Sequence, residues 1–290
     1  MAPLQQHDSF AAALTLLGRA PVRLGPHLML SRRFAGGLRV NLLSRVDLGD
    51  VVLPDLLKEH RAPVIVSPEW AAPGLARNGA VPVMTPATLA ELPLTDAATM
   101  RAAMHPKWRN RLKQAETLPL RLSVQKMKPD PGHWLLLAEA AQRRANRYSG
   151  WPPVLTLAFA DANPGAARLF TAHRGTEAIA AMLFLRHGDA ATYHIGHTTD
   201  PGRAASAHSW LLWQAMLWHA QRGCTLLDLG LIDTARNPGL ARFKLGSGAL
   251  PRRLGGTWAW WPRLGRLLAP LARLDRKAFA EDSAPASSLS

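Results

Sequence analysis

Three apolar segments separated by very short turns constrain this chain more than any other feature of its sequence. They occupy residues 167–173, 177–186 and 191–197, and the turns between them lie at residues 174–176 and 188–189. Apolar segments joined by such tight turns favour neighbouring antiparallel strands. A long apolar-faced helix over residues 206–221, ended by Gly223, and a strand over residues 224–229 follow. This order predicts an antiparallel sheet covered by a helix.

The rest of the chain mixes helices and strands in the same way. Amphipathic patterns predict helices over residues 10–17, 95–104, 107–116 and 133–148, with strands over 27–30, 38–44, 64–67, 120–125 and 254–260. Prolines recur between residues 63 and 93 and exclude long helices there. The fold class we expect is α/β (α+β), with a mixed, mostly antiparallel sheet flanked by helices.

Composition limits the class of protein. The chain has 290 residues, 48% of them hydrophobic and 19% charged, which is the balance of a globular protein with a substantial core. Cys224 is the single cysteine, so no disulfide forms within the chain. No apolar stretch approaches the roughly 20 residues of a membrane span, and residues 1–8 lack a secretory signal. We therefore expect a cytoplasmic protein.

The chain is strongly basic. Its formal net charge is +15 and its isoelectric point is about 11.3. Such a field favours anionic partners such as nucleic acid, a phosphorylated cofactor or an anionic membrane surface. The alternative is a solvated surface in an arginine-rich composition that selects no partner.

A short segment before the long helix is the first candidate binding site. The start of a helix offers free N–H groups and the positive end of its dipole, which together hold phosphates. Here the segment contains Gly202, Arg203, Ala205 and Ser206. Gly202 would let the backbone approach a ligand closely, and Arg203 adds a cation. The alternative is an ordinary turn between strand and helix.

Two further motifs accompany this segment. Residues 104–116 contain Trp108, Arg109-Asn110 and Ala115-Glu116, and residues 228–248 contain Asp228, Gly239-Leu240 and Phe243-Lys244. In order and spacing, these pieces resemble the FemAB-type branch of the GNAT acyltransferase superfamily. The segment around Arg203 resembles that superfamily's pyrophosphate loop, although Ser206 and His208 stand where glycines are usual.

The resemblance implies two tandem GNAT-like halves. We expect a degenerate N-terminal half at residues 1–94, a catalytic half at residues 95–262, and an amphipathic helix with a disordered tail at residues 263–290. The resemblance also implies an N-acyltransferase that uses acyl-CoA or acetyl-CoA as donor and an amine-bearing small molecule or cell-envelope precursor as acceptor. Two alternatives remain: an aminoacyl-tRNA donor, and a non-catalytic protein that binds nucleic acid or a membrane surface.

Attack of an amine on an acyl carbonyl builds an oxyanion and releases a proton. Lys244 is the candidate cation for the oxyanion, and Tyr193, His194 and His197 are candidates for proton transfer. Strand alternation predicts Tyr193 and His197 on one face and His194 on the other. Asp228 could orient a histidine or pair with an arginine. Each of these residues also has an ordinary structural interpretation, as a core or surface side chain.

The basic helix is a candidate substrate site. Lys107, Trp108, Arg109 and Asn110, together with Asp228 and Phe243, form the predicted substrate-binding set, and a solvated helix face is the alternative. We expect no metal, because His194 and His197 lack a third ligand of suitable spacing. The chain has no Gly-x-Ser-x-Gly elbow, dinucleotide fingerprint or Walker loop.

A basic, leucine-rich segment lies near the C-terminus. Residues 258–277 combine three tryptophans, leucines at helical spacing and interspersed arginines. This pattern is suited to the inner face of an anionic membrane, where it would give peripheral contact. A helix packed on the protein's own core is the alternative.

Overall fold

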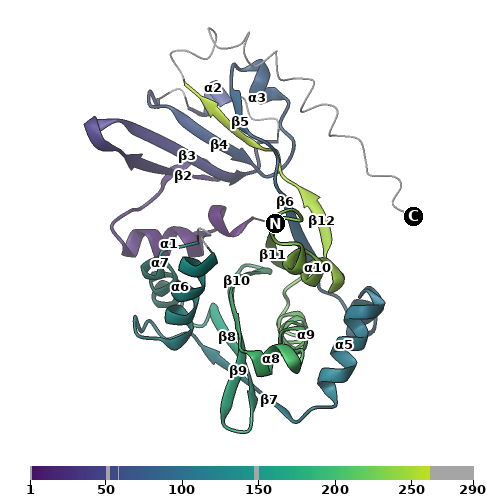
Figure 1. The fold of residues 1–290 in the computed structure, drawn as a ribbon. Coiled ribbons are helices and arrows are strands. Elements are labelled where there is room, and N and C mark those ends of the chain that lie inside the picture. The colour runs from purple at the N-terminus through teal and green to yellow at the C-terminus, as the bar shows by residue number, and fades with distance from the viewer. Residues whose placement is uncertain (1, 50–52, 58, 147–149, 262–290) are drawn as a thin grey trace. The chain divides into compact units, whose positions relative to one another are not determined.

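The structure is a computed structural model that describes residues 2–49, 53–57, 59–146 and 150–261 (Figure 1). The chain forms two compact units. The larger unit contains residues 1–20 and 88–252, and the smaller unit contains residues 21–87 together with the residues from Arg253 onward.

The larger unit is built on a seven-stranded sheet with the strand order β12-β6-β11-β10-β9-β8-β7. Its strands are β6 (Thr88–Pro93), β7 (Leu120–Lys126), β8 (Ala167–Arg174), β9 (Glu177–His187), β10 (Ala190–Thr198), β11 (Leu226–Ile232) and β12 (Leu250–Arg253). The β8–β9–β10 meander is antiparallel, as the short turns predict, and β10 pairs with β11 in parallel. The predicted class of mixed, mostly antiparallel sheet is confirmed.

Helices cover both faces of this sheet. They are η1 (Leu4–Gln6), α1 (Asp8–Leu16), α4 (Ala97–Ala102), α5 (Pro106–Glu116), α6 (Trp134–Asn146), α7 (Pro153–Ala162), α8 (Asp200–Ala204), α9 (Ala207–Ala220) and α10 (Pro238–Gly246). On one face, the rings of Trp218 and His219 from α9 pack on Phe170 of β8. On the other face, α6 contacts β10 and α1 packs on α7. Each face of the sheet therefore has its own helical cover.

A β-bulge at His194 changes the facing of β10. Tyr193 pairs with Phe184 and Ile195 pairs with Leu183, so His194 has no partner of its own on β9. The extra residue reverses the alternation beyond it. Tyr193 therefore shares a face with Thr198, on the side of α9, whereas His197 lies on the other face, against Trp134 of α6. The prediction that Tyr193 and His197 share a face is wrong.

The smaller unit has a six-stranded sheet with the order β1-β2-β3-β4-β13-β5. Its elements are β1 (Val22–Leu24), β2 (His27–Arg33), η2 (Ala35–Gly37), β3 (Arg39–Val46), α2 (Leu53–Leu56), β4 (Val64–Pro68), α3 (Gly74–Arg77), β5 (Val81–Met84) and β13 (Thr257–Trp260). One parallel pair, β3–β4, interrupts an otherwise antiparallel sheet. The two units thus repeat one pattern, and the expected fold of two GNAT-like halves is confirmed.

The compact units divide the chain differently from the expected domains. The first helix, placed at sequence level in the N-terminal half, packs on α7 of the larger unit, and Asn163 Nδ2 donates a 2.9 Å hydrogen bond to Ser9 O. The strand predicted at 254–260 is β13, which pairs with β4 and β5 of the smaller unit. The spacing of motifs along the sequence does not predict that the first helix packs in the larger unit or that a late strand pairs in the smaller one.

Two further local predictions need correction. The short segment before the long helix contains a further helix, α8. Helix α7 is absent from the predicted helices, since prolines such as Pro152 and Pro153 are typical of a helix end. Proline is equally suited to the first turn of a helix, and here Pro153 begins one.

The aromatic part of the predicted membrane segment has a structural role. Trp258 and Trp260 are buried in the core of the smaller unit, so they form no exposed aromatic belt. Residues 262–277 of the predicted segment, and the whole predicted domain 263–290, lie outside the described residues.

Candidate active site

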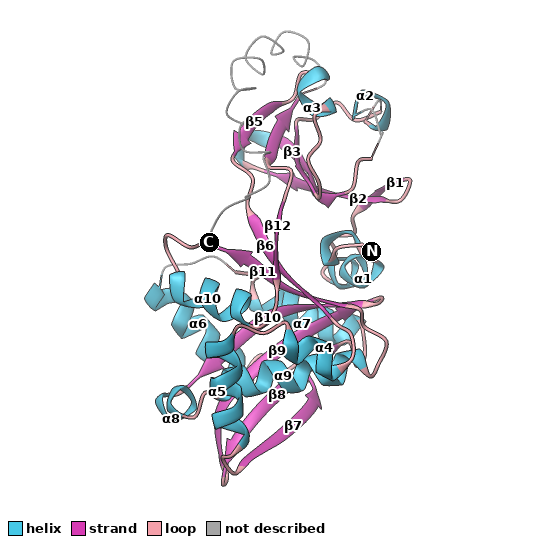
Figure 2. Cartoon of the chain, turned by 90° about the vertical axis from the view of Figure 1, so that its right-hand side faces the viewer, coloured by secondary structure: helices cyan, strands magenta, loops and turns pink. Residues whose placement is uncertain are grey.

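A pocket lies at the N-terminal end of α9 in the larger unit. Its volume is ≈ 400 Å³. The lining residues come from α5, the end of β10, α8 and the start of α9: Arg111, Thr198, Gly202, Arg203, Ser206, His208 and Ser209. Figure 2 shows α5, α8 and α9 alongside one another. The pocket thus joins three of the predicted binding residues, Gly202, Arg203 and Ser206, to residues outside the predicted set.

The amides that we expected to hold a phosphate are mostly engaged within the protein. The Gly202 N–H donates to Thr199 Oγ1 and the Ser206 N–H donates to Arg203 O. The Ala205 N–H likewise donates to Pro201 O, because these residues form a helical turn. Within the described part of the chain, no residue accepts a hydrogen bond from the N–H of Ala207 or His208, the first two residues of α9. The free amides therefore belong to Ala207 and His208, which follow the predicted residues.

Gly202 is required by packing rather than by ligand approach. A Cβ at this position would lie 2.1 Å from Ile179 O and 2.6 Å from Thr198 Oγ1. Contacts that short force the neighbouring backbone to move. The glycine therefore lets α8 pack closely on β9, which fixes the side of the pocket.

Ser206 has a conformation that is rare outside glycine. Its φ is 50°, in the left-handed region, and its side chain makes no capping hydrogen bond at the start of α9. Such strain in a non-glycine residue is concentrated at functional sites. Its hydroxyl is available at the pocket.

The cations of the pocket differ in their availability. Arg203 pairs with Asp200 and also donates to Thr198 O, so its charge is partly satisfied. Arg111 makes no ion pair with any residue that the structure describes. Arg111 belongs to the basic helix, whose cations we expect to suit phosphates, but it is not among the residues predicted to bind substrate. Its spacing of four residues from Lys107 places both on the exposed face of α5.

The parallel strands beside the pocket separate. Pairing between β10 and β11 ends at Thr192 and Asp228, although β10 continues to Thr198 and β11 to Ile232. A bulge in β11 on its other edge, against β6, includes Gly230 with a φ of 77°. The separation opens the sheet between its two central strands.

Lys244 lies beside this separation. The side chain extends from α10 and is 6% exposed, and Nζ donates a 2.8 Å hydrogen bond to Leu231 O. Burial lowers the pKa of Lys244 from 10.5 to about 8, and the charge of Asp228 opposes that fall. Asp228 itself accepts from the Gly230 N–H at 2.7 Å. Asp228 thus lies beside a lysine, whose ammonium form its charge favours.

Aromatic side chains connect the pocket to α10. The ring of Phe243 lies 6.1 Å from that of His208 and 6.2 Å from that of Trp108. Trp108 is buried, and its Nε1–H has no partner among the described residues. A Cβ on Gly246 would lie 3.0 Å from the Trp108 ring, so this glycine makes room for the indole. Phe243 and Trp108 therefore come together with His208 near Lys244.

The three histidines near the pocket are half-buried. His194 hydrogen-bonds Thr156, its ring lies 4.7 Å from that of Trp151, and burial lowers its pKa to about 4. Burial also lowers the pKa of His197, with Arg203 acting in the same direction. His208 has a pKa lowered by burial, and its Nε2 lies 2.9 Å from His197 O. His194 and His197 thus lie on the face of β10 opposite Tyr193, away from the side of α9.

The remaining predicted residues stay apart from the pocket. Lys107 and Asn110 are exposed on α5 and Arg109 is half-buried. None of the three lines the cavity. In the described residues, no group of three or more His, Cys, Asp or Glu side chains could hold a metal ion, and no helix is both long and apolar enough to cross a bilayer.

Chemically, this end of the larger unit combines an anion site with a protonated amine. Arg111, Arg203 and two free amides suit phosphates. A lysine with a pKa near 8 is still mainly cationic at neutral pH and can donate to a developing oxyanion. Between the two groups, the pairing of β10 with β11 ends.

Comparison with protein families gives a match to this unit. Residues 102–245 match the family model of the acetyltransferase (GNAT) domain. That range contains α5, the pocket, the separated strands and Lys244. A comparison with curated protein sequences gave no match.

Solved structures share the whole fold. FemX covers 94% of this chain and 94% of its own length, with a TM-score of 0.70 and 13% identity. The C-terminal domain of a protein assigned as a lysylphosphatidylglycerol synthetase in Agrobacterium fabrum covers 95% and 93%, with a TM-score of 0.60 and 13% identity. L-PGS from Bacillus licheniformis covers 92% and 95%, with a TM-score of 0.51 and 13% identity. The family match and this shared fold show that the chain contains a GNAT acetyltransferase domain, at residues 102–245, and has a fold similar to that of FemX.

Proposed function

We propose that this chain is an N-acyltransferase that transfers an acyl group from acyl-CoA to an amine acceptor. The observation that carries the proposal is the cation-lined pocket at the start of α9, next to the separation of β10 and β11. Phosphates of the donor would bind Arg111, Arg203 and the amides of Ala207 and His208.

Lys244 would act on the acyl carbonyl. The acceptor nitrogen attacks the thioester carbon, so a C–N bond forms, the C–S bond breaks, the nitrogen gives up one proton and the CoA thiolate takes one. Protonated Lys244 would donate to the oxyanion that forms between these events. Asp228 supports that role because its charge favours the ammonium form.

Tyr193 is our candidate for proton transfer. It shares the face of β10 with Thr198, which lines the pocket, whereas His194 and His197 occupy the opposite face. A Cβ on Gly196 would lie 1.8 Å from the Tyr193 hydroxyl, so the absence of a side chain there lets the phenol lie along the strand. We therefore assign the two histidines positioning roles.

Calorimetry with CoA, acetyl-CoA and a long-chain acyl-CoA tests the donor. We expect micromolar binding that Arg111→Ala and Arg203→Ala each weaken about tenfold, since a charge-assisted contact contributes about 1.5–3 kcal/mol. Arg121→Ala, an exposed arginine on β7, is the matched control and should change little. No binding of any of the three donors would exclude this function.

An aminoacyl-tRNA donor is the second candidate. The likeness to FemX and the exposed cations Lys107, Arg111 and Lys113 on α5 favour it. Binding of tRNA that falls steeply with salt and with Lys107→Ala/Lys113→Ala, together with no binding of CoA, would select this donor. The acceptor we propose is an amine-bearing small molecule or cell-envelope precursor, and the site of action is the cytoplasm or the inner face of the membrane.

A further inference from the structure

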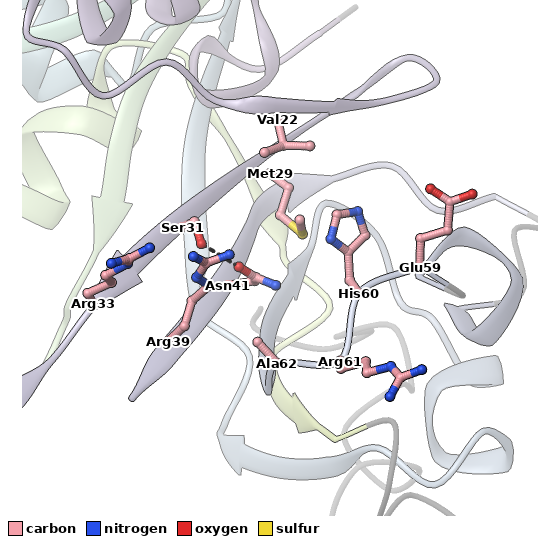
Figure 3. Close-up of a pocket in the computed structure, with 10 residues that line it drawn as sticks. All are labelled: Val22, Met29, Ser31, Arg33, Arg39, Asn41, Glu59, His60, Arg61 and Ala62. Carbon is pink, nitrogen blue, oxygen red and sulfur yellow. Dashed lines mark hydrogen bonds between the residues drawn. The ribbon is translucent and has the colours of Figure 1, made fainter. Parts of the chain in front are cut away.

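A second cavity lies in the smaller unit, and none of its lining residues belongs to the proposed donor site. Its volume is ≈ 440 Å³, within the range of small-molecule sites. The lining residues are Val22, Met29, Ser31, Arg33, Arg39, Asn41, Glu59, His60, Arg61 and Ala62. Figure 3 shows these side chains, which come from β1, β2, β3 and the segment before β4.

Two arginines are placed directly opposite one another on this hairpin. Arg33 of β2 pairs in register with Arg39 of β3, and Ser31 pairs with Asn41. Because side chains alternate along a strand, all four share one face. Like charges at directly opposed positions destabilise a sheet. Neither arginine makes an ion pair with a described residue, so the repulsion has no acidic compensation within that part of the chain.

A buried amide lies between these cations and the rest of the cavity. Asn41 is 3% exposed, and its Oδ1 accepts a 2.7 Å hydrogen bond from Ser31 Oγ. The amide Nδ2 makes no hydrogen bond with another described residue, and it has two N–H groups that can donate to a ligand. Nδ2 is thus a donor without a protein partner at the same face as the arginines.

The side of the cavity opposite the two arginines determines which ligands fit. His60 and Ala62 come from the segment before β4, which the hydrogen bond from Asn41 N to Pro63 O holds against β3. Glu59 and Arg61 lie on that side, away from the Ser31–Asn41 pair (Figure 3), and their formal charges cancel. Val22 and Met29 supply an apolar border. The cavity therefore favours a ligand with one strongly anionic group and a small apolar part.

We propose that this cavity binds the phosphate group of a small phosphorylated molecule or of an anionic lipid headgroup. The guanidinium groups of Arg33 and Arg39 would bind the phosphate oxygens, since the planar fork of arginine matches phosphate. Asn41 Nδ2 would supply a further donor, and the bound anion would remove the repulsion between the arginines. This ligand is separate from the donor of the proposed function.

Two probes separate the sources of phosphate. Calorimetry with glycerol 3-phosphate tests a soluble ligand, and co-sedimentation with vesicles of equal parts phosphatidylcholine and phosphatidylglycerol tests a lipid, with phosphatidylcholine vesicles as blank. We expect one probe to bind and Arg33→Gln/Arg39→Gln to weaken that binding at least about tenfold. Arg77→Gln, an exposed arginine of α3 outside the cavity, is the matched control and should keep the wild-type affinity.

Thermal unfolding without ligand checks that the double variant folds. Removing opposed like charges should leave its melting temperature equal to or above that of the wild type. Binding of neither probe by the wild type would overturn the proposal, as would an equal loss of binding in Arg77→Gln, which would indicate unspecific attraction to a basic surface. Loss of CoA binding alone would bear on the proposed function and leave this site unaffected.

Discussion

The two units carry the same strand pattern but treat the end of their parallel pair differently. In the larger unit, β10 and β11 separate after Thr192 and Asp228, and Lys244 lies beside the opening. In the smaller unit, β3 and β4 stay paired as far as Val46 and Pro68. One pattern thus gives an opened sheet in one unit and a closed sheet in the other.

A buried ion pair lies at the closed end. Arg45, at a bulge with a φ of 50°, donates two hydrogen bonds of 2.7 and 2.8 Å to the carboxylate of Glu69. The two side chains are 13% and 8% exposed. In the larger unit, the cation beside the parallel pair is Lys244, whose pKa is lowered by burial. In the smaller unit, the cation is Arg45, and both carboxylate oxygens of Glu69 accept hydrogen bonds from it. The two units thus differ in whether the end of the parallel pair is open beside a lysine or closed beside an ion pair.

The largest expected effect concerns Lys244, beside the separated ends of β10 and β11. Lys244→Met should lower kcat by ~10²–10³-fold, because one oxyanion donor is lost. In the wild type, the rate should fall as pH rises above about 8, where Lys244 loses its proton. Asp228→Asn should move that fall to lower pH, since the carboxylate raises the pKa of Lys244. Initial rates across pH measure both effects.

Lys126→Met is the matched control for Lys244, since it removes an exposed lysine from β7. Wild-type rates in Lys244→Met would show that the open end has no chemical role, and the contrast between the two units would be structural alone.

The next effect concerns the Arg45–Glu69 ion pair, at the paired ends of β3 and β4. Glu69→Gln leaves the Arg45 cation buried without its carboxylate, which should cost about 3 kcal/mol of the free energy of unfolding. Denaturant titration measures this loss. CoA affinity should stay as in the wild type, because the ion pair belongs to the smaller unit. Weaker CoA binding in a folded Glu69→Gln variant would mean that the two ends are coupled.

The smallest expected effect is a loss of stability at low pH that is confined to the larger unit. Burial lowers the pKa of His194 to about 4 and of His219 to about 3, from 6.5. The unfolded chain therefore binds more protons below pH 6.5, so stability is full above that value and is lost as pH falls toward 4. Hydrogen exchange should show β8–β10 losing protection in this window, and His219→Leu should reduce the loss. Equal loss in β3–β4 and β8–β10 would contradict a local origin.

Much of the larger unit follows from sequence because its signals are local. The turns at Gly175 and Gly188, both with positive φ, fix the antiparallel meander, and the helix that ends before Gly223 follows from its apolar face. The positions of Lys244 and Phe243 near one another follow from the motif. These features need only neighbouring residues to be specified.

The facing of the site residues could not be predicted in the same way. The bulged residue, His194, contacts Thr156 of α7 and Trp151, which precedes that helix. Arg111 reaches the pocket only because α5 packs on α9. The engaged amide of Gly202 follows from the turn of α8, which no short motif specified. Each of these outcomes is set by tertiary contact, which overrides local pattern.

The strand order of the smaller sheet has a consequence for how the chain is made. β13 lies between β4 and β5, and Thr257 Oγ1 lies 3.2 Å from Ser67 Oγ across a separation of 190 residues. A ribosome therefore exposes β4 and β5 with open edges long before the strand that joins them leaves the exit tunnel. Because domains form in order of synthesis at about 5–20 residues per second, the smaller sheet receives β1 to β5 before most of the larger unit is made, and receives β13 only after it. The nascent smaller sheet therefore exposes unpaired strand edges during the synthesis of the larger unit.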